Sequence, residues 1–514
     1  MTFVRSVLTV GSWTLISRIL GFIRDILMAS VLGTGWIADA FFVSQRFPNL
    51  FRSLFAEGAF NSSFIPIFSK FLEQENLRSA QRFAEEVLAI MVAFLLGLTI
   101  LMQIFMPWVM GILAPGFSQN AVQYDLAVKL TQITFPYLLF ISLTALQGGI
   151  LNALHHYVHA AAAPILLNII MIIALAGIIP LFGWPAYVLA WSVSLSGIGQ
   201  FIWMALACRH VNISLKLRFP HLTKAVRQLF KLMIPGVIGA GAMQINVMVG
   251  TMIASLNAGA VSYLYYADRI YQLPLAIVGT AIGVVLLPEL SRDLAAQRIE
   301  KAMTTLNRSV EMALIFTVPA AIAFLVIPHQ IIYVLFERGA FSTLATESTS
   351  LALMAYSIGL PAYVLVKVLT PLFFARHDTK TPFRFAMISL ISNILFSLIF
   401  YHFIGFIGIA LATSLASLIN VILLIYQSIK HRYWIVDKQF IWSLPKLLAC
   451  GTIMGLGLWF VGYVFVLDNQ IGLLGKILYL CILIMTGFVL FIGFALLVKL
   501  IRYKDFIKML KRTK

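Results

Sequence analysis

Residues 17–60 read SRILGFIRDILMASVLGTGWIADAFFVSQRFPNLFRSLFAEGAF, the pattern of two apolar helices joined by the short turn GTGW. The charged residues of this stretch are Arg18, Arg24, Asp25, Asp39, Arg46, Arg52 and Glu57. A charge at the centre of a lipid-exposed helix costs about 2.5–3.5 kcal/mol even on the lenient insertion scale. We therefore expect these side chains to face a protein interior or a hydrated cavity with an excess of positive charge.

The whole chain has the composition of a membrane protein. Of its 514 residues, 61% are hydrophobic and 11% are charged, and the mean hydropathy is +0.96. Soluble domains are about 25% charged. We predict an all-α polytopic membrane protein with about fourteen spans. Their predicted ranges are 7–31, 36–69, 84–109, 126–152, 160–181, 185–207, 226–256, 261–290, 302–335, 345–374, 382–403, 405–429, 440–466 and 472–500.

The net charge of +18 does not predict nucleic-acid binding, because of how the charge is distributed. Lys and Arg gather in alternate short loops between the apolar stretches, and the intervening loops have almost none, Arg338 being the exception. This bias predicts that both termini are cytoplasmic. One predicted cytoplasmic loop carries His155, His156 and His159 instead of Lys and Arg, and the sequence assigns them no role.

No metal site or other cofactor is predicted. The three histidines lie in a loop without a nearby carboxylate, which is a poor ligand set for zinc. The cysteines are Cys208, Cys450 and Cys481. They lie in or at the ends of apolar stretches, without the spacing of a metal site or a disulfide framework.

Two pairs of segments indicate an internal repeat. IPIFSKFL at 65–72 resembles LPELSRDL at 287–294, and FPYLLFISLTALQGGILNALHH at 135–156 resembles LPAYVLVKVLTPLFFARHD at 360–378. An even number of spans separates the copies, so the halves are parallel, as in some transporters. We predict an N-terminal lobe of six helices at 1–220 and a C-terminal lobe of six at 221–432. Residues 433–514 then hold two additional helices and a basic tail.

The candidate site consists of arginines at membrane depth, namely Arg18, Arg24, Arg52 and Arg269. If they face one cavity between the lobes they require an anion, and the rigid guanidinium fork suits phosphate. The expected supporting residues are Asp25, Asp39, Arg46, Asn49, Glu57, Asp268 and Lys367. The alternative is that the acids and arginines form buried ion pairs that only fix helix packing. The excess of arginine argues against that alternative.

The first helix poses a geometric problem for this site. Arg24 and Asp25 are about 100° apart on a helix, so a straight helix cannot aim every charge inward. We therefore expect a bend or break near Gly21, or water on more than one face. Polar residues in other apolar spans, Asn168 among them, are expected to form interhelical hydrogen bonds rather than to bind a coupling cation.

Four motifs resemble the MurJ (MviN) family of lipid II flippases. They are SRILGFIRD at 17–25, DAFFVSQRFPNLFRSLFAEGAF at 39–60, APGF at 114–117 and YYADRIYQLP at 265–274. The resemblance implies a chain that flips undecaprenyl-pyrophosphate-linked disaccharide-pentapeptide from the cytoplasmic to the periplasmic leaflet, for peptidoglycan synthesis. It also implies that the four arginines match the family's cavity arginines and that the last two helices form a groove for the lipid tail. Gln272 stands where Glu can occur, which leaves its role open.

The expected partners are lipid II, membrane lipids, cell-wall synthesis enzymes, and either a coupling cation or the membrane potential. No enzymatic activity and no nucleic-acid partner are expected. A flippase for another lipid-linked oligosaccharide and a multidrug exporter of the same superfamily are alternatives; the exporter should carry acidic rather than basic cavity residues. A membrane glycosyltransferase would need acidic catalytic groups in the outer loops, which are short and nearly uncharged. A non-transporting scaffold would leave the arginines unexplained.

Overall fold

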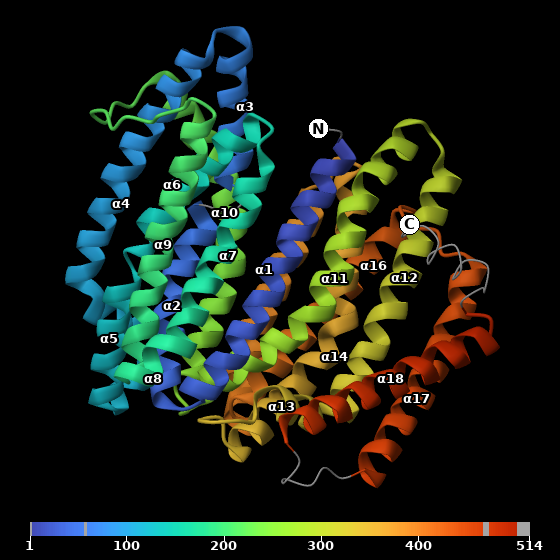
Figure 1. Ribbon diagram of the computed structural model, residues 1–514. Helices are drawn as coiled ribbons and strands as arrows, with labels where there is room; N and C mark the ends of the chain where they lie inside the picture. Colours follow the sequence, from blue (N-terminus) through green and yellow to red (C-terminus); the bar gives the residue numbers. More distant parts are fainter. Residues whose placement is uncertain (1–2, 56–58, 466–471, 501–514) are drawn as a thin grey trace. The chain divides into compact units, whose positions relative to one another are not determined.

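The computed structural model describes residues 3–55, 59–465 and 472–500, and every regular element within these ranges is a helix (Figure 1). Glu57 and the tail after residue 500 lie outside the described residues. Two compact units are present. Unit 1 comprises Met1–Ser262 with Arg338–Phe341, and unit 2 comprises Tyr263–Glu337 with Ser342–Lys514.

Unit 1 is a helical bundle. Its helices are α1 (Phe3–Leu32), α2 (Trp36–Phe55), α3 (Ala59–Gln74), α4 (Leu77–Leu113), α5 (Ala121–Thr134), α6 (Tyr137–Ala153), α7 (Tyr157–Ile173), α8 (Ile179–Phe182), α9 (Pro185–His210) and α10 (Lys224–Ala254). Helix α1 packs on α7, α2 on α5, and α6 on α9. The first turn of α11 also belongs to this unit.

Unit 2 is a second bundle. It contains α11 (Ala260–Ala295), α12 (Ile299–Val326), α13 (Pro328–Phe336), α14 (Thr343–Phe374), α15 (Lys380–Ile404), α16 (Ile407–Lys430), α17 (Lys438–Val464) and α18 (Leu473–Leu497). Helix α16 packs on α14 and α15, α12 packs on α14 and α17, and α17 packs on α18. Small residues allow close approach: Gly359 lies against Ser414, whose Oγ donates to Ala355 O at 2.6 Å. Such contacts are typical of helix packing in membranes.

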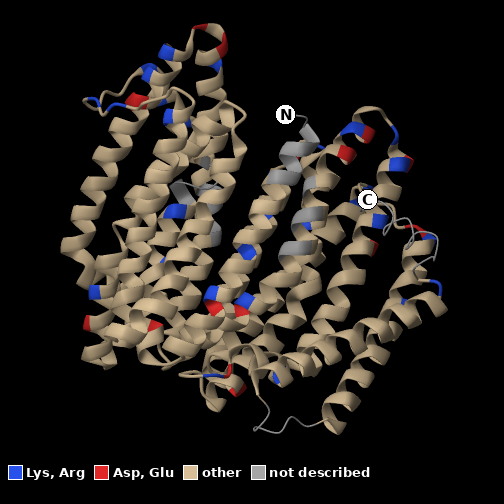
Figure 2. Cartoon of the chain, in the orientation of Figure 1, with Lys and Arg blue, Asp and Glu red and all other residues tan. Residues whose placement is uncertain are grey.

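The helices have the length and composition of membrane spans. Ten helical segments of the described residues are long and apolar enough to cross a bilayer. Figure 2 shows that most Lys and Arg lie near helix ends rather than along these segments. The all-α polytopic fold class is therefore confirmed. The remaining predicted spans correspond to α1, α2 with α3, α10 and α11, so the total of fourteen stays a prediction. The boundaries at 220 and 432 also stay predictions.

Two predicted spans are each divided by a proline. The predicted span 126–152 is α5 followed by α6, with Phe135 and Pro136 between them. The predicted span 302–335 is α12 followed by α13, which begins at Pro328. Proline lacks the N–H that would continue the preceding helix, and it is favoured at the first position of the next one. Hydropathy alone does not detect such divisions, because the apolar composition continues across them.

Helix α1 is not broken near Gly21, and the other two expectations, a bend there or water on more than one face, stay predictions. It is a single helix from Phe3 to Leu32. A Cβ added at Gly21 would lie 3.7 Å from the side-chain amide of Asn168, in ordinary contact. The packing of α1 against α7 at this position therefore does not require glycine, and the helix continues through it.

Candidate substrate-binding site

Arg24 is held by two partners within unit 1. Its Nη2 lies 2.8 Å from Oδ1 of Asp25, and its Nε donates to the same oxygen at 3.1 Å. Its Nη1 donates to Oδ1 of Asn168 on α7 at 2.9 Å. Asp25 is 3% exposed, so this ion pair is shielded from water. The guanidinium of Arg24 folds back onto the carboxylate of Asp25. The two adjacent charges therefore meet, although their positions on the helix are about 100° apart.

Asn168 bonds to α1 through both ends of its amide. Besides accepting from Arg24, it donates from Nδ2 to the backbone oxygen of Ser17 at 2.9 Å. It is 5% exposed and lies one helical turn after Pro164. The prediction that Asn168 forms interhelical hydrogen bonds is confirmed. Its particular partner, Arg24, was not predicted, because the sequence does not show which helix α7 contacts.

The other two arginines of unit 1 are more accessible. Arg18 is exposed and lies less than two turns before Arg24 on α1. Arg52 is half-buried, and its Nε donates to Oδ1 of Asn49 on the same helix at 3.0 Å. Asn49 is therefore positioned to orient Arg52. The accessible Arg18 and half-buried Arg24 and Arg52 are suited to exchange a protein or water contact for an anion.

Arg46 lines a small, partly open pocket of unit 1. The pocket has a volume of about 20 Å³, and Gln244, Thr251 and Leu113 also line it. Such a volume holds roughly one water molecule. It is far too small for a pyrophosphate, so Arg46 at this pocket is placed to interact with water or with α10.

Asp39 is buried at one end of unit 1 and binds backbone amides. Its Oδ2 accepts from Gly259 N at 2.6 Å, and its Oδ1 accepts from Ser262 N at 2.8 Å. It therefore caps the first turn of α11, where unpaired N–H groups and the helix dipole favour a carboxylate. The sequence did not predict this cap, and the expectation that Asp39 supports the arginine site stays a prediction.

Unit 2 carries the fourth candidate arginine on α11. The guanidinium carbon of Arg269 lies 4.6 Å from the ring centroid of Tyr265, one turn earlier. The adjacent Asp268 accepts a hydrogen bond from Nε2 of Gln272 at 2.5 Å. Gln272 can donate to Asp268, whereas a carboxylate at position 272 would repel it.

Lys367 lies on α14 and contacts α11. Its Cδ would lie 3.0 Å from a Cβ added at Gly279, and its Nζ is 5.7 Å from the ring centroid of Tyr363. The glycine makes room for the lysine stem, and the ring face attracts its ammonium. The side chain is half-buried.

Each unit thus carries cationic side chains that neighbouring groups hold in place. Unit 1 supplies Arg24 with Asp25 and Asn168, and Arg52 with Asn49. Unit 2 supplies Arg269 with Tyr265. Guanidinium groups held in this way can bind phosphate through two parallel hydrogen bonds. None of these groups is arranged as a nucleophile with a base.

Comparisons with known proteins match the chain along most of its length. Residues 28–479 match the family model described as lipid II flippase MurJ. A probable lipid II flippase MurJ from Rhizobium tropici is 44% identical over 463 residues, covering 88% of this chain and 86% of the relative. One from Rickettsia prowazekii is 35% identical over 510 residues, covering 98% and 99%.

The chain is also similar to solved structures. A structure titled as lipid II flippase MurJ in an inward closed conformation has a TM-score of 0.81 and 28% identity, covering 97% of this chain and 99% of that one. An inward-facing multidrug transporter of the MATE family has a TM-score of 0.68 at 14% identity, covering 81% and 94%. The second likeness shows a common fold only. The chain belongs to the MurJ family of lipid II flippases.

Proposed function

We propose that this chain moves lipid II from the cytoplasmic to the periplasmic leaflet of the bacterial inner membrane. The substrate class rests on membership of the MurJ family. The observation that carries the chemistry is the position of Arg24, a cation on a membrane helix that is bonded to the carboxylate of Asp25 and the amide of Asn168. In this proposal Arg24 acts together with Arg18 and Arg52, the other two candidate arginines of unit 1, on an anionic substrate.

The energetic task is to carry a pyrophosphate and sugars through about 30 Å of hydrocarbon. Desolvation blocks that movement unless polar groups replace water. In this proposal Arg18, Arg24, Arg52 and Arg269 replace the hydration of the pyrophosphate in a cationic central cavity. The two six-helix lobes open this cavity to each leaflet in turn by alternating access.

The polyprenyl tail has a separate path in this proposal. Exposed apolar side chains line α17 and α18, including Trp459, Phe460, Leu478 and Met485. The two helices pack closely at Gly487, where an added Cβ would lie only 3.3 Å from the side chain of Leu458. We assign the tail to this surface, so that it stays in an apolar medium while the head group crosses.

Directionality requires a source of energy. A membrane potential is worth about 2.3 kcal/mol per elementary charge per 100 mV. With both termini in the cytoplasm, as the Lys and Arg distribution indicates, a negative interior favours the return of a cationic empty cavity toward the cytoplasm. A coupled cation would serve the same purpose, and dissipating the potential with and without a sodium gradient separates the two sources.

The substrate is tested by reconstituting the purified chain into vesicles with fluorescent lipid II. We expect lipid II to become accessible to a reagent outside the vesicle at a rate that depends on the chain. A lipid-linked oligosaccharide with a different glycan serves as the competing substrate. Equal transport of both lipids would contradict specificity for lipid II, and transport of neither would contradict the proposed function.

A further inference from the structure

The loop between α9 and α10, residues 211–223, is fastened to the first turns of α4. Lys216 N donates to Oε1 of Glu85 at 3.2 Å, and Arg218 Nε donates to Oε2 of Glu85 at 2.5 Å. Two more side chains of α4 bond to the loop, in the pairs Gln81 Nε2 with Ser214 O (2.7 Å) and Glu86 Oε2 with Thr223 Oγ1 (2.9 Å). The loop is therefore held at a fixed level along α4.

The fastened loop nevertheless exposes large apolar side chains. Leu217 is 68% exposed, Phe219 is 85% exposed and Leu222 is 56% exposed, whereas Ile213 at the start of the loop is fully buried. Clustered exposed apolar side chains mark an interaction surface. The loop binds α4 through its backbone, Arg218 and Thr223, and leaves the side chains of Leu217, Phe219 and Leu222 exposed for a partner.

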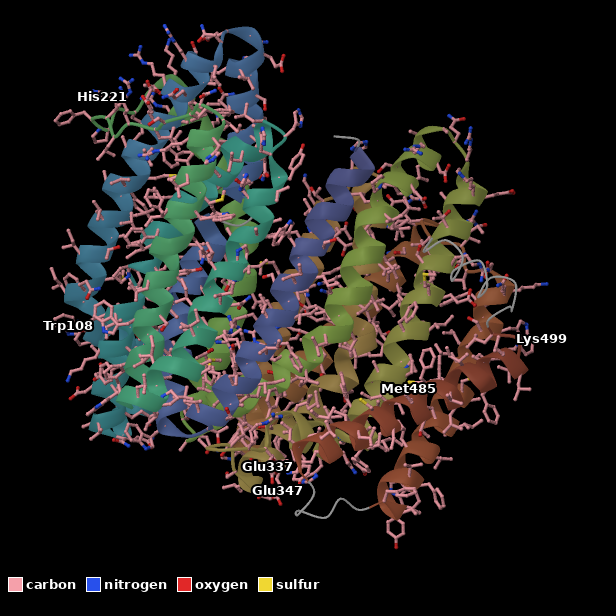
Figure 3. All side chains as sticks on the ribbon, in the orientation of Figure 1. Trp108, His221, Glu337, Glu347, Met485 and Lys499 are labelled. Atoms are coloured by element: carbon pink, nitrogen blue, oxygen red, sulfur yellow. The ribbon has the colours of Figure 1, made fainter. Side chains whose placement is uncertain are left out.

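The level of the loop along α4 identifies that partner as the membrane surface. Between Val87 and Leu113 the helix carries no charged residue. The distance from Glu86 to the exposed Trp108 is about 33 Å at 1.5 Å per residue, close to the thickness of the hydrocarbon core. Tryptophan is enriched at membrane–water interfaces, so we take Trp108 to mark one interface and the pair Glu85 and Glu86 to mark the other. Figure 3 shows His221 of the loop and Trp108 toward opposite ends of this face of unit 1.

The charge of the loop specifies the kind of lipid. Between residues 209 and 227 the sequence contains no Asp or Glu. The basic residues of this stretch are Arg209, Lys216, Arg218, Lys224 and Arg227, and all are exposed. Juxtamembrane Lys and Arg attract acidic lipid head groups. Basic side chains beside exposed Leu and Phe are the composition of an interfacial anchor.

We propose that residues 211–223 anchor unit 1 to the cytoplasmic leaflet. Leu217, Phe219 and Leu222 enter the boundary between head groups and acyl chains, and Lys216 and Lys224 bind acidic phospholipid head groups. Glu85 holds Arg218 and thereby sets the depth of the loop. The anchor fixes the segment that joins the two predicted lobes, and it does not depend on the identity of the transported substrate.

The test places a spin label on the loop of the full-length chain. The exposed Cys481 is replaced by Ser, the buried Cys208 and Cys450 are kept, and Phe219→Cys is labelled. The protein is reconstituted in nanodiscs of phosphatidylcholine, with or without phosphatidylglycerol. We expect the label to collide several-fold more often with lipid-soluble oxygen than with a water-soluble nickel complex, and the ratio to rise with phosphatidylglycerol.

Two matched variants make the result decisive. Glu75→Cys, on the exposed turn between α3 and α4, should give a label that favours the nickel complex. Lys216→Gln with Lys224→Gln should keep the label at position 219 in lipid but remove its response to phosphatidylglycerol. The anchor would be overturned if the label at position 219 were as accessible to the nickel complex as the label at position 75. It would also be overturned if the label at position 219 became protected from the nickel complex only after cytosolic protein was added. An unchanged response in the double variant would overturn the recognition of acidic lipid.

Discussion

Nη1 of Arg24 donates a hydrogen bond to Oδ1 of Asn168, which lies 144 residues further along the chain, at 2.9 Å. Asn168 also donates to the backbone of Ser17, so one amide fixes both the helix α1 and the side chain of its central arginine. Asp25 holds the other edge of the guanidinium. This arrangement sets the direction in which Arg24 presents its charge.

Loss of the Asn168 contact should weaken substrate transport without removing any charge. Asn168→Leu removes the hydrogen bond from Nη1 of Arg24 and keeps the ion pair with Asp25. A hydrogen bond to a charged group contributes about 1.5–3 kcal/mol, so we expect transport to fall roughly ten-fold or more. Transport of labelled lipid II into the outer leaflet of vesicles measures the effect. Asn393→Leu, at a polar contact between α15 and α16, is the control and should transport normally. Equal transport by the Asn168 variant would contradict the positioning role.

Removal of the Asp39 carboxylate should destabilise the protein. Asp39→Ala leaves the buried N–H groups of Gly259 and Ser262 without their acceptor. A buried donor left unsatisfied costs about 1–3 kcal/mol. We expect a lower melting temperature in detergent, with a smaller decrease for Asp39→Asn, which keeps one acceptor. The exposed Glu75→Ala variant should melt like the parent, and an Asp39→Ala protein that did the same would refute the capping role.

Gly33, which follows α1, and Gly339, which packs against the end of α1 from the segment between α13 and α14, should not tolerate alanine. Gly33 and Gly339 have left-handed φ values of +62° and +58°. A Cβ on Gly33 would lie 2.3 Å from Ala340 O, and one on Gly339 would lie 2.2 Å from Ser30 O. Strain of this kind costs about 1–3 kcal/mol per position. Thermal unfolding of Gly33→Ala and Gly339→Ala should show this loss.

The matched control for these glycines is Gly97 on α4. A Cβ there would meet no atom within 4 Å, and the backbone is helical. Alanine is favoured over glycine in a helix by roughly 0.5–1 kcal/mol, so Gly97→Ala should melt at the same temperature or higher. Similar losses in all three variants would mean that the close approach is not the cause.

The stabilisation that the Asp378 carboxylate gives to the folded protein should depend on pH. It lies in the turn before α15, and its Oδ1 accepts from Thr381 N at 3.0 Å. Burial by itself raises the pKa of this carboxyl, but hydrogen bonds from Thr381 and Lys380 outweigh it, so the pKa lies below its usual 3.8. The carboxylate therefore stabilises the fold above the unfolded pKa, and that stabilisation is lost as pH falls through the folded pKa.

The corresponding experiment compares Asp378→Ala with the parent chain across a pH series. Loss of the cap should cost about 0.5–2 kcal/mol at neutral pH. The difference in melting temperature should shrink as the pH falls below 3.8. A difference that stays constant throughout the acid range would show that the charge of Asp378 does not contribute.

The sequence predicted the fold class through local signals, because apolar stretches of spanning length predicted the helices. It named Asp25 as a supporting residue but did not predict that Asp25 pairs with its neighbour Arg24, and the role of the arginines as a substrate site stays a prediction. The role of Asn168 as an interhelical contact followed from a polar residue in an apolar span. These predictions needed no knowledge of which helices are neighbours.

Features that depend on distant segments were missed. Asp39 reaches Gly259 and Ser262, more than 200 residues away. The APGF motif is explained by Gly116, whose missing Cβ allows Ser255 O to approach within 2.1 Å of that position. Nothing in either local sequence identifies the partner, because helix pairing is set by packing across the whole unit. The pair of glycines at 33 and 339 was missed for the same reason.

The central claim is that Arg24, together with Arg18, Arg52 and Arg269, binds the pyrophosphate of lipid II while the lipid crosses the membrane. The most direct measurement is the fraction of lipid II accessible at the outer leaflet of cells that have no other flippase and express this chain. We predict normal exposure with the parent chain, and loss of exposure with Arg24→Ala at equal membrane abundance. Normal exposure with Arg24→Ala, or unchanged exposure when the parent chain is depleted, would contradict the account.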